Sequence, residues 1–242
     1  MDRFFWLAPC ALLPFSANAA APFPSDDITT SVGVVRISFL GHGTLMLTHG
    51  QTVIHVDPFG QVADYASLPK ADLILITHEH FDHLDLAAIK KIRTDKTAII
   101  APPICASSLP EAILLRNGEH TTKAGIVIHA VPAYNIKHER APGKPFHPRG
   151  VGNGYILTFG DTRLYIAGDT ENTPEMKALT NITVAFLPMN LPYTMTPEMV
   201  ADAARAFKPK ILYPYHYGDT DPTRLTKLLK DTGIEVRIRP MR

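Results

Sequence analysis

Cysteine is scarce in this chain. Its 242 residues include only two, Cys10 and Cys105, and Cys10 lies in an N-terminal segment that we expect to be removed. The remaining chain would then contain Cys105 alone, which excludes an internal disulfide. Cys105 stands in an apolar, proline-rich stretch with no evident base beside it. We therefore predict a buried, unreactive thiol and no cysteine nucleophile.

Long apolar runs and an excess of charge are missing as well. The 24 Lys and Arg residues balance 23 Asp and Glu residues and leave a net charge of +1, so nothing suggests a nucleic-acid-binding surface. The apolar run at 4–15 is too short to span a bilayer.

That run follows Arg3 and precedes the small-x-small pattern Ala17-Asn18-Ala19, so it predicts a signal peptide over 1–19. Residues 20–242 then form a single domain of ordinary size. We expect a periplasmic or secreted protein with no membrane span once the leader is removed. The sequence leaves the oligomeric state open.

An apolar run in the first half of the chain stops abruptly in a cluster of histidines and acids. Residues 72–76 are short, continuous and rich in Leu and Ile, which predicts a buried strand. Residues 85–92 carry apolar side chains at helical spacing, with Asp85 as the expected N-cap. The cluster therefore occupies a loop between the carboxyl end of a strand and a helix.

The cluster has the pattern His-x-His-x-Asp-His. Side chains alternate in extended backbone, so His78 and His80 share one side and can hold one metal ion with two imidazoles. A turn at Asp82 and His83 could aim these two side chains at a second ion close by. The alternative is a solvated polar turn, which is the usual explanation for a single histidine but not for a cluster directly after a buried strand.

The rest of the chain predicts mostly short strands separated by Gly- and Pro-rich turns. Strands without helices come first, which suggests an antiparallel meander, and strands alternate with helices later. A helix should begin at Thr196 as N-cap, with Met199, Ala203 and Ala206 facing the core, and another lies near 222–230. Strands are expected at 34–40, 44–48, 52–56, 97–100, 125–131, 154–159, 162–167, 183–187, 210–213 and 235–238.

Polar side chains follow two of the later strands. Asp169 comes after one of them and His216 after another, although each taken alone would be an ordinary turn or structural residue. Two loops are candidates for the substrate side of a site. The segment 137–150 is long enough to be a lid, and 188–195, which includes Tyr193, would border the substrate.

Three segments together resemble the signature of the metallo-β-lactamase superfamily: the cluster at 78–83, Gly168-Asp169-Thr170 and Tyr215-His216-Tyr217-Gly218. The resemblance implies an α/β fold, an αββα sandwich in which two mixed β-sheets pack face to face with helices on the outer faces. It also implies metal-dependent hydrolysis of a small-molecule substrate, with Asp169 as a carboxylate that bridges two ions. The implied metal ligands are His78, His80, Asp82, His83, Asp169 and His216.

The turn Gly41-His42-Gly43-Thr44 and the segment Asp57-Pro58-Phe59 resemble one branch of the superfamily. That branch contains L-ascorbate-6-phosphate lactonase and N-acyl-phosphatidylethanolamine phospholipase D. The resemblance implies that His42 faces the active site. The alternative is a turn histidine hydrogen-bonded to the backbone.

One position departs from the superfamily pattern. The segment 131–138 falls where a third histidine usually reaches the first metal, and the resemblance places Asn135 there instead. An amide oxygen binds a borderline divalent ion less well than an imidazole, so the ion held by the first two histidines should bind more weakly than the other. His138 or His147 could compensate, or both could be incidental loop histidines.

The implied chemistry needs no protein nucleophile. Two neighbouring divalent ions lower the pKa of a bridging water, and the resulting hydroxide could attack an ester, lactone, phosphodiester or amide bond, with Asp82 and His83 at the catalytic centre. Imidazoles and carboxylates suit two Zn²⁺ ions and would also admit Mn²⁺ or Fe²⁺. Two other classes remain open: a non-catalytic or mononuclear metal-binding protein, and a di-iron oxidoreductase, although no electron-carrier domain is evident.

Overall fold

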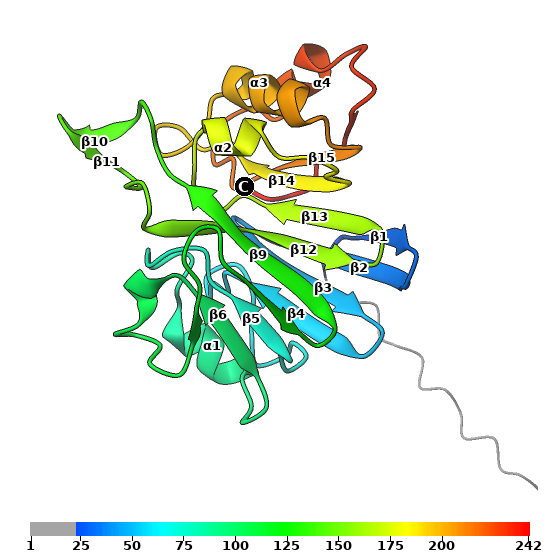
Figure 1. The fold of residues 1–242 in the computed structure, drawn as a ribbon, viewed down its shortest axis with the longest axis vertical. Coiled ribbons are helices and arrows are strands. Elements are labelled where there is room, and N and C mark those ends of the chain that lie inside the picture. Colours follow the sequence, from blue (N-terminus) through cyan, green and yellow to red (C-terminus); the bar gives the residue numbers. More distant parts are fainter. Residues whose placement is uncertain (1–22) are drawn as a thin grey trace, which may run out of the picture.

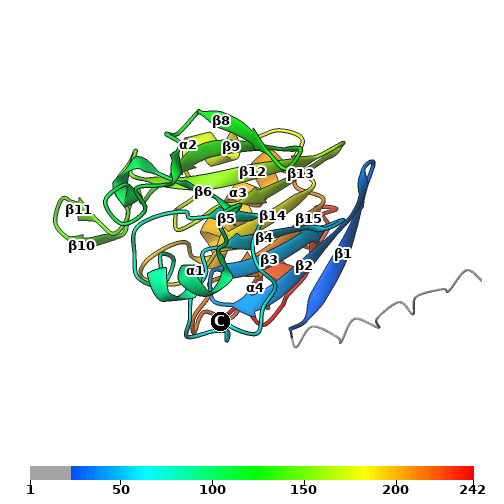
Figure 2. The same ribbon diagram turned by 90° about the horizontal axis from the view of Figure 1, so that it is seen from below.

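Two seven-stranded sheets packed face to face form the centre of the molecule (Figures 1 and 2). The computed structural model describes residues 23–242, so the predicted signal peptide lies outside the described residues. In spatial order the first sheet contains β1 (Ser25–Thr30), β2 (Gly33–Gly41), β3 (Thr44–His49), β4 (Thr52–Val56), β5 (Leu73–Leu75), β6 (Ala98–Ala101) and β7 (Ile113–Leu114). The second contains β16 (Glu235–Val236), β15 (Ile211–Tyr215), β14 (Val184–Pro188), β13 (Thr162–Ile166), β12 (Gly152–Phe159), β9 (Ile126–Ala133) and β8 (His120–Lys123).

Both sheets are mixed, as the sequence analysis predicted. In the first sheet β1 to β4 pair antiparallel in chain order, which confirms the predicted meander, and β4 to β7 pair parallel. In the second sheet β13 to β16 pair parallel, and β8, β9, β12 and β13 pair antiparallel. Consecutive parallel strands place their carboxyl ends at one edge of a sheet, and the functional side chains follow those ends.

Helices cover the two outer faces of the sandwich. Figure 1 shows α1 (Leu86–Ile92) on the outside of the first sheet. On the outside of the second sheet it shows α2 (Pro174–Lys177), α3 (Pro197–Phe207) and α4 (Arg224–Leu228). A 3₁₀ turn lies at Pro103–Cys105. The predicted αββα sandwich is thus confirmed. Among residues 23–242, no helix is both long and apolar enough to cross a membrane.

The core has three layers that match this architecture. One apolar cluster lies between the sheets and includes Phe39, Phe186 and Tyr213, whose rings pack against one another. A second lies under α2 to α4, and a third under α1. Cys105 is buried in the third cluster, as predicted, and burial raises the pKa of its thiol to about 12.

The two helix starts predicted from the sequence are correct. The Asp85 side chain accepts hydrogen bonds from the first backbone N–H groups of α1, and Thr196 caps α3 in the same way. The core-facing stripe of α3 was predicted wrongly in part. Val200, Ala203, Ala204 and Phe207 are buried, whereas Met199 is only half-buried and Ala206 is exposed. The helix buries the stripe at i, i+3, i+4 and i+7, and Ala206 lies off that stripe.

The segment predicted as one long loop contains a hairpin. Strands β10 (Glu139–Ala141) and β11 (Lys144–Pro145) pair antiparallel and project away from the sandwich (Figure 1). Their side chains are largely exposed, so no alternation of apolar and polar residues marks them in the sequence. The edge strand β1 was missed for a similar reason, because its Ser-Asp-Asp start gives little apolar signal.

Candidate metal centre

The polar side chains predicted from the sequence converge where parallel strands of both sheets end. The His-x-His-x-Asp-His cluster follows β5 in the first sheet. In the second sheet Asp169 follows β13 and His216 follows β15. Residues separated by about 140 positions thus meet at one place, because both sheets present the carboxyl ends of their parallel strands to the same side.

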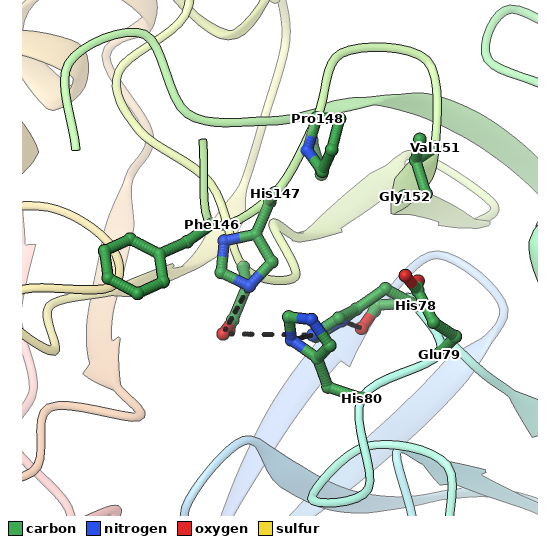
Figure 3. A pocket seen from close by; sticks show the side chains of 11 residues that line it. His78, Glu79, His80, Phe146, His147, Pro148, Val151 and Gly152 are labelled. Atoms are coloured by element: carbon green, nitrogen blue, oxygen red, sulfur yellow. Dashed lines mark hydrogen bonds and ion pairs between the residues drawn. The ribbon is translucent and has the colours of Figure 1, made fainter. Parts of the chain in front are cut away.

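Three imidazoles form one group. His78 Nε2 and His80 Nδ1 lie 3.1 Å apart, so the two rings lie together as predicted, although the backbone bends at Glu79 and His80 and is not an extended strand there. The third ring belongs to His147, and its nitrogen lies within 4.8 Å of theirs. Figure 3 shows the His147 ring facing the other two across a small recess. This is the geometry of three nitrogen ligands to one ion.

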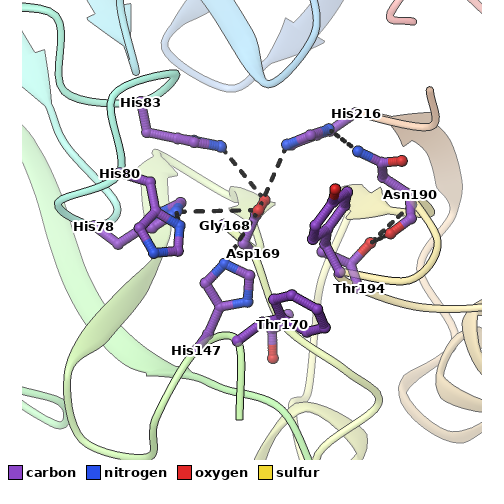
Figure 4. Close-up of polar contacts among 12 residues, drawn as sticks. His78, His80, His83, His147, Gly168, Asp169, Thr170, Asn190, Thr194 and His216 are labelled. Atoms are coloured by element: carbon purple, nitrogen blue, oxygen red, sulfur yellow. Dashed lines mark hydrogen bonds and ion pairs between the residues drawn. The ribbon is translucent and has the colours of Figure 1, made fainter. Parts of the chain in front are cut away.

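Asp169 lies at the centre of the site. Its Oδ2 is 3.4 Å from His147 Nε2, 3.4 Å from His216 Nε2 and 4.0 Å from His78 Nε2. Its Oδ1 is 3.6 Å from His83 Nε2. Figure 4 shows the four imidazoles pointing at this carboxylate. The carboxylate therefore faces ring nitrogens on both sides, as a bridging ligand would.

A second group lies on the other side of Asp169. One ligand atom from each of four side chains lies within 4.8 Å of the other three, and these side chains are His42, Asp82, His83 and His216. His83 Nε2 and His216 Nε2 are each 3.9 Å from Asp82 Oδ2. His42 faces the site, and its Nε2 is hydrogen-bonded to the same Asp82 oxygen at 2.9 Å. Its ring also packs on His216, with the centroids 3.7 Å apart.

Several of these atoms are buried and lack a hydrogen-bond partner within the described chain. They are His83 Nε2, His147 Nε2, His216 Nε2 and Asp169 Oδ1. A buried polar atom without a partner costs free energy, so native proteins seldom leave one in place without a ligand. Four such atoms that point at one another indicate a site built for cations.

Burial and neighbouring charges shift the pKa values of several side chains at the site. Burial disfavours the imidazolium of His83, but Asp169 and Asp57 outweigh burial and raise its pKa to about 9. Burial lowers the pKa of His147 to about 4 and holds that of His78 well below its usual range. Burial opposes ionisation of Asp82, yet its contact with His42 lowers the pKa to about 2.

Three residues at the site have left-handed backbone. The φ angles are +52° at His42, +44° at Asp57 and +45° at His216. This conformation is uncommon and unfavourable for residues other than glycine, and it concentrates at functional sites where the surrounding fold enforces it. Here His42 N donates to Arg242 O, and His216 N donates to His42 O. These backbone bonds hold two imidazoles in place across the two sheets.

The sequence-based placement of Asn135 as a metal ligand is wrong. Its Oδ1 accepts hydrogen bonds from the backbone N and Nδ1 of His147, at 2.8 and 2.7 Å. The ring nitrogen Nδ1 therefore carries the proton and Nε2 is left free to bind a cation. The ring that joins His78 and His80 in the group of three is therefore that of His147, and Asn135 orients it from behind.

His138 was the other candidate for this role, and it points elsewhere. Its Nδ1 lies 2.7 Å from the carboxylate of Glu171, which also accepts hydrogen bonds from the backbone N–H groups of Ile136, Lys137 and His138. The fully buried Glu171 thus fixes the start of the loop that carries His147. Its side chain also accepts from Asn135 Nδ2 at 3.1 Å.

The sequence analysis assigned no role in holding the histidines to three residues that have one in the structure. Asp57 is fully buried and lies 2.8 Å from His83 Nδ1. It follows β4 directly, so the signal that marked Asp169, a carboxylate after a strand, was present. Asn190 follows β14, and its Nδ2 lies 3.4 Å from His216 Nδ1. Glu171 gave no signal, because its role depends on a loop distant in the sequence.

An open cavity of about 470 Å³ lies over the two groups. Of the groups described above, the cavity is lined by His42, His80, Asp82, His147, Asp169 and His216. Its walls include Phe81, Phe146 and Tyr193, so Tyr193 lies beside the site as predicted. The Phe146 and Tyr193 rings meet edge to face with centroids 5.0 Å apart. The volume is in the range of small-molecule sites.

Comparison with known proteins agrees with this geometry. Residues 36–216 match the family profile described as a β-lactamase superfamily domain. The chain belongs to the metallo-β-lactamase superfamily. This superfamily member is 33% identical over 227 residues to a UPF0173 metal-dependent hydrolase of Thermococcus kodakarensis, covering 86% of this chain and 97% of that protein. It is 32% identical over 203 residues to one from Thermus thermophilus, covering 79% and 87%.

Solved structures extend the comparison. A protein from Parabacteroides distasonis assigned as a metal-dependent hydrolase shares 51% identity and a TM-score of 0.87, covering 91% of this chain and all of that one. CmlA, a di-iron β-hydroxylase from Streptomyces venezuelae, has a TM-score of 0.70 at 18% identity, over 91% of this chain and 54% of that one. The second likeness shows the fold alone. The relatives identify this superfamily member as a metal-dependent hydrolase.

Proposed function

We propose that this chain is a dinuclear zinc hydrolase that cleaves an ester, lactone, phosphodiester or amide bond in a small substrate. The observation that carries the proposal is the set of four buried, unpartnered atoms on His83, His147, His216 and Asp169. Removing such atoms from water without a partner is costly, and cations between them would satisfy all four.

The donor set fits two ions. His78, His80 and His147 would hold one ion, and Asp82, His83 and His216 the other, with Asp169 between them. Three nitrogens and a carboxylate, or two nitrogens and two carboxylates, are sets that zinc accepts. When bound, two such ions supply Lewis acidity and a water of lowered pKa, which replaces a protein nucleophile.

The chain's own residues then orient and enclose the site. Asp57 accepts the Nδ1 proton of His83, so that ring presents Nε2 to the centre. Asn135 does the same for His147. His42 holds the Asp82 carboxylate by a hydrogen bond. Phe146 and Tyr193 line one wall of the cavity over these groups.

No observation favours the mononuclear or non-catalytic alternative. That alternative rested on Asn135 replacing a histidine ligand, and His147 now provides the third imidazole of the group. The di-iron alternative has only a fold-level likeness behind it, and fold alone does not decide chemistry. Zinc is preferred over manganese because imidazole nitrogens dominate the donor set, and metal analysis distinguishes zinc from iron.

We also propose that the protein works in the periplasm or outside the cell. The support is the sequence pattern of residues 1–19. Intact-mass measurement of the protein from an expressing cell tests this. A mass that begins near Ala20 is the expected result. A soluble cytosolic product that retains the residues before Ala17 would contradict it.

The function is tested by metal analysis paired with a substrate panel of esters, lactones, phosphodiesters, amides and β-lactams. We expect two zinc equivalents per chain and turnover of at least one bond class. Asp169→Asn should lower the metal content and abolish turnover, because one carboxylate serves both groups. Asp95→Asn is the matched control, since Asp95 is exposed and makes no side-chain hydrogen bond or ion pair within residues 23–242. One equivalent in fully loaded protein, or no turnover of any class, would refute the proposal.

A further inference from the structure

One cationic side chain stands in the wall of the cavity over the metal centre. It is Arg140, on strand β10 of the projecting hairpin. No other Lys or Arg lines this cavity in the part of the chain that the structure describes. Hydrolysis at a centre made of histidines and carboxylates does not require an arginine at this distance, so the residue calls for a separate explanation.

The Arg140 guanidinium is held in place but not neutralised. Its Nη2 donates to the backbone carbonyl of Phe146 at 2.8 Å, and its Cζ lies 5.7 Å from the centre of the Phe146 ring. Within residues 23–242 it forms no ion pair and its remaining nitrogens donate to no protein atom. A guanidinium with free N–H groups in one plane matches a carboxylate or phosphate, which accept two parallel hydrogen bonds.

The position of this group is tied to the metal centre through the chain itself. Arg140 is bonded to the carbonyl of Phe146, and the next residue, His147, directs its Nε2 at Asp169. A shift of the hairpin would therefore move the guanidinium and the imidazole together. Arg140, His147 and Asp169 also line the same cavity, so one ligand could contact the guanidinium and the metal centre together.

Aromatic side chains also line the cavity. Phe146 and Tyr193 pack edge to face along one wall, and Phe81, 73% exposed, packs against Phe59 on another. A large apolar side chain this exposed at the mouth of a cavity gains from being covered by an apolar ligand. The cavity thus offers a polar floor, apolar walls and one cation.

We propose that the substrate carries an anionic group, a carboxylate or a phosphate, separated by an apolar body from the bond that is hydrolysed. Arg140 binds that group, and Phe81, Phe146 and Tyr193 contact the body. Arg140 is a specificity-determining residue in this scheme and takes no part in the bond cleavage. The inference rests on the proposed hydrolase function for the site, and it adds the class of substrate.

The test compares matched substrates on protein with verified, equal metal content. All three substrates are 4-nitrophenyl esters of a carboxylic acid. Mono-(4-nitrophenyl) glutarate carries a free carboxylate, 4-nitrophenyl 4-phosphonobutanoate carries a free phosphonate, and 4-nitrophenyl butyrate is neutral. Arg140→Gln should raise KM about tenfold to a hundredfold for the anionic esters, the usual range for losing a charge-assisted hydrogen-bonded pair, and leave the neutral ester unchanged. Arg140→Lys should recover part of the loss, since a point charge remains without the planar fork.

Arg149→Gln is the matched control. Arg149 lies on the same loop but pairs with Glu175 and lines no part of the cavity, so KM should not change for any ester. An equal effect of Arg140→Gln on neutral and anionic esters, or no effect on either, overturns the inference while the hydrolase function stands.

If none of the esters is hydrolysed, the proposed function is in question and binding decides the inference separately. Ligand-observed NMR would then compare phenylacetate and benzylphosphonate with benzyl alcohol. The two anions should bind the wild type more tightly than the alcohol does, and Arg140→Gln should remove the difference. If the anions still bind more tightly than the alcohol in Arg140→Gln, a role for Arg140 is refuted. If only one of the two anions binds the wild type more tightly than the alcohol, that anion identifies the group that the site prefers.

Discussion

Replacing Asn135 with alanine removes the acceptor that orients His147. In the structure Oδ1 of Asn135 accepts two hydrogen bonds from His147, and Nδ2 donates to Glu171 and to the carbonyl oxygen of Tyr193. Asn135 is buried, with 6% of its surface exposed, so its partners are not already bonded to bulk water. The substitution therefore leaves the His147 ring without its fixed orientation and its preferred tautomer.

Two estimates of the loss in metal affinity caused by Asn135→Ala agree. Losing an outer partner of a metal-binding histidine usually costs about tenfold to a hundredfold in metal affinity. A buried hydrogen-bonding group left without its partner costs about 1 to 3 kcal/mol, which corresponds to the same range. The loss should fall on one ion, because His147 belongs to the group with His78 and His80. The ion held by the group on the other side of Asp169 should keep its affinity within a few-fold.

The assay is zinc titration of metal-free protein against a competing chelator, with Asn172→Ala as the matched control. Within residues 23–242 the Asn172 amide forms one hydrogen bond, which it donates to Asp202, so that variant should bind both ions as the wild type does. Nitrogen NMR of the imidazoles adds a readout independent of affinity, since His147 should lose its single tautomer in Asn135→Ala. Unchanged affinities for both ions together with an unchanged His147 spectrum would refute the positioning role.

Two further predictions concern a close contact and a buried histidine. In Gly43→Ala the new Cβ would lie 2.9 Å from His83 Cε1, so the His83 ring must move. The same chelator competition should then show about a tenfold fall in zinc affinity. An unchanged affinity would show that the His83 ring can move without weakening the site. Burial lowers the pKa of His55 to about 4, whereas the unfolded chain titrates near 6.5. As the pH falls, His55 therefore takes up a proton in the unfolded state before it does so in the folded state. The free energy of unfolding should fall by up to about 3 kcal/mol between pH 6.5 and pH 4 for this reason. Urea unfolding at pH 7 and 4.5 should show a smaller acid loss in His55→Gln, and equal losses would contradict this.

The sequence determined those parts of the site that are local in the chain. His78, His80, Asp82 and His83 lie within six positions of one another, directly after a buried strand. The strand before them and the Asp85 cap after them were predicted correctly for the same reason, since apolar spacing and capping depend on near neighbours. Asp169 and His216 were identified by strand ends and by family resemblance.

Only the tertiary structure decided how the third imidazole is supplied. Asn135 and His147 are 12 positions apart, and a hairpin with no burial pattern lies between them. The carboxylate that fixes this loop, Glu171, lies 36 positions beyond Asn135 on the connection after β13. Likewise Asp57 reaches His83 only because β4 and β5 pair side by side. Hydrogen bonds between distant residues depend on how sheets and loops pack, and neither periodicity nor propensity in the sequence encodes that packing directly.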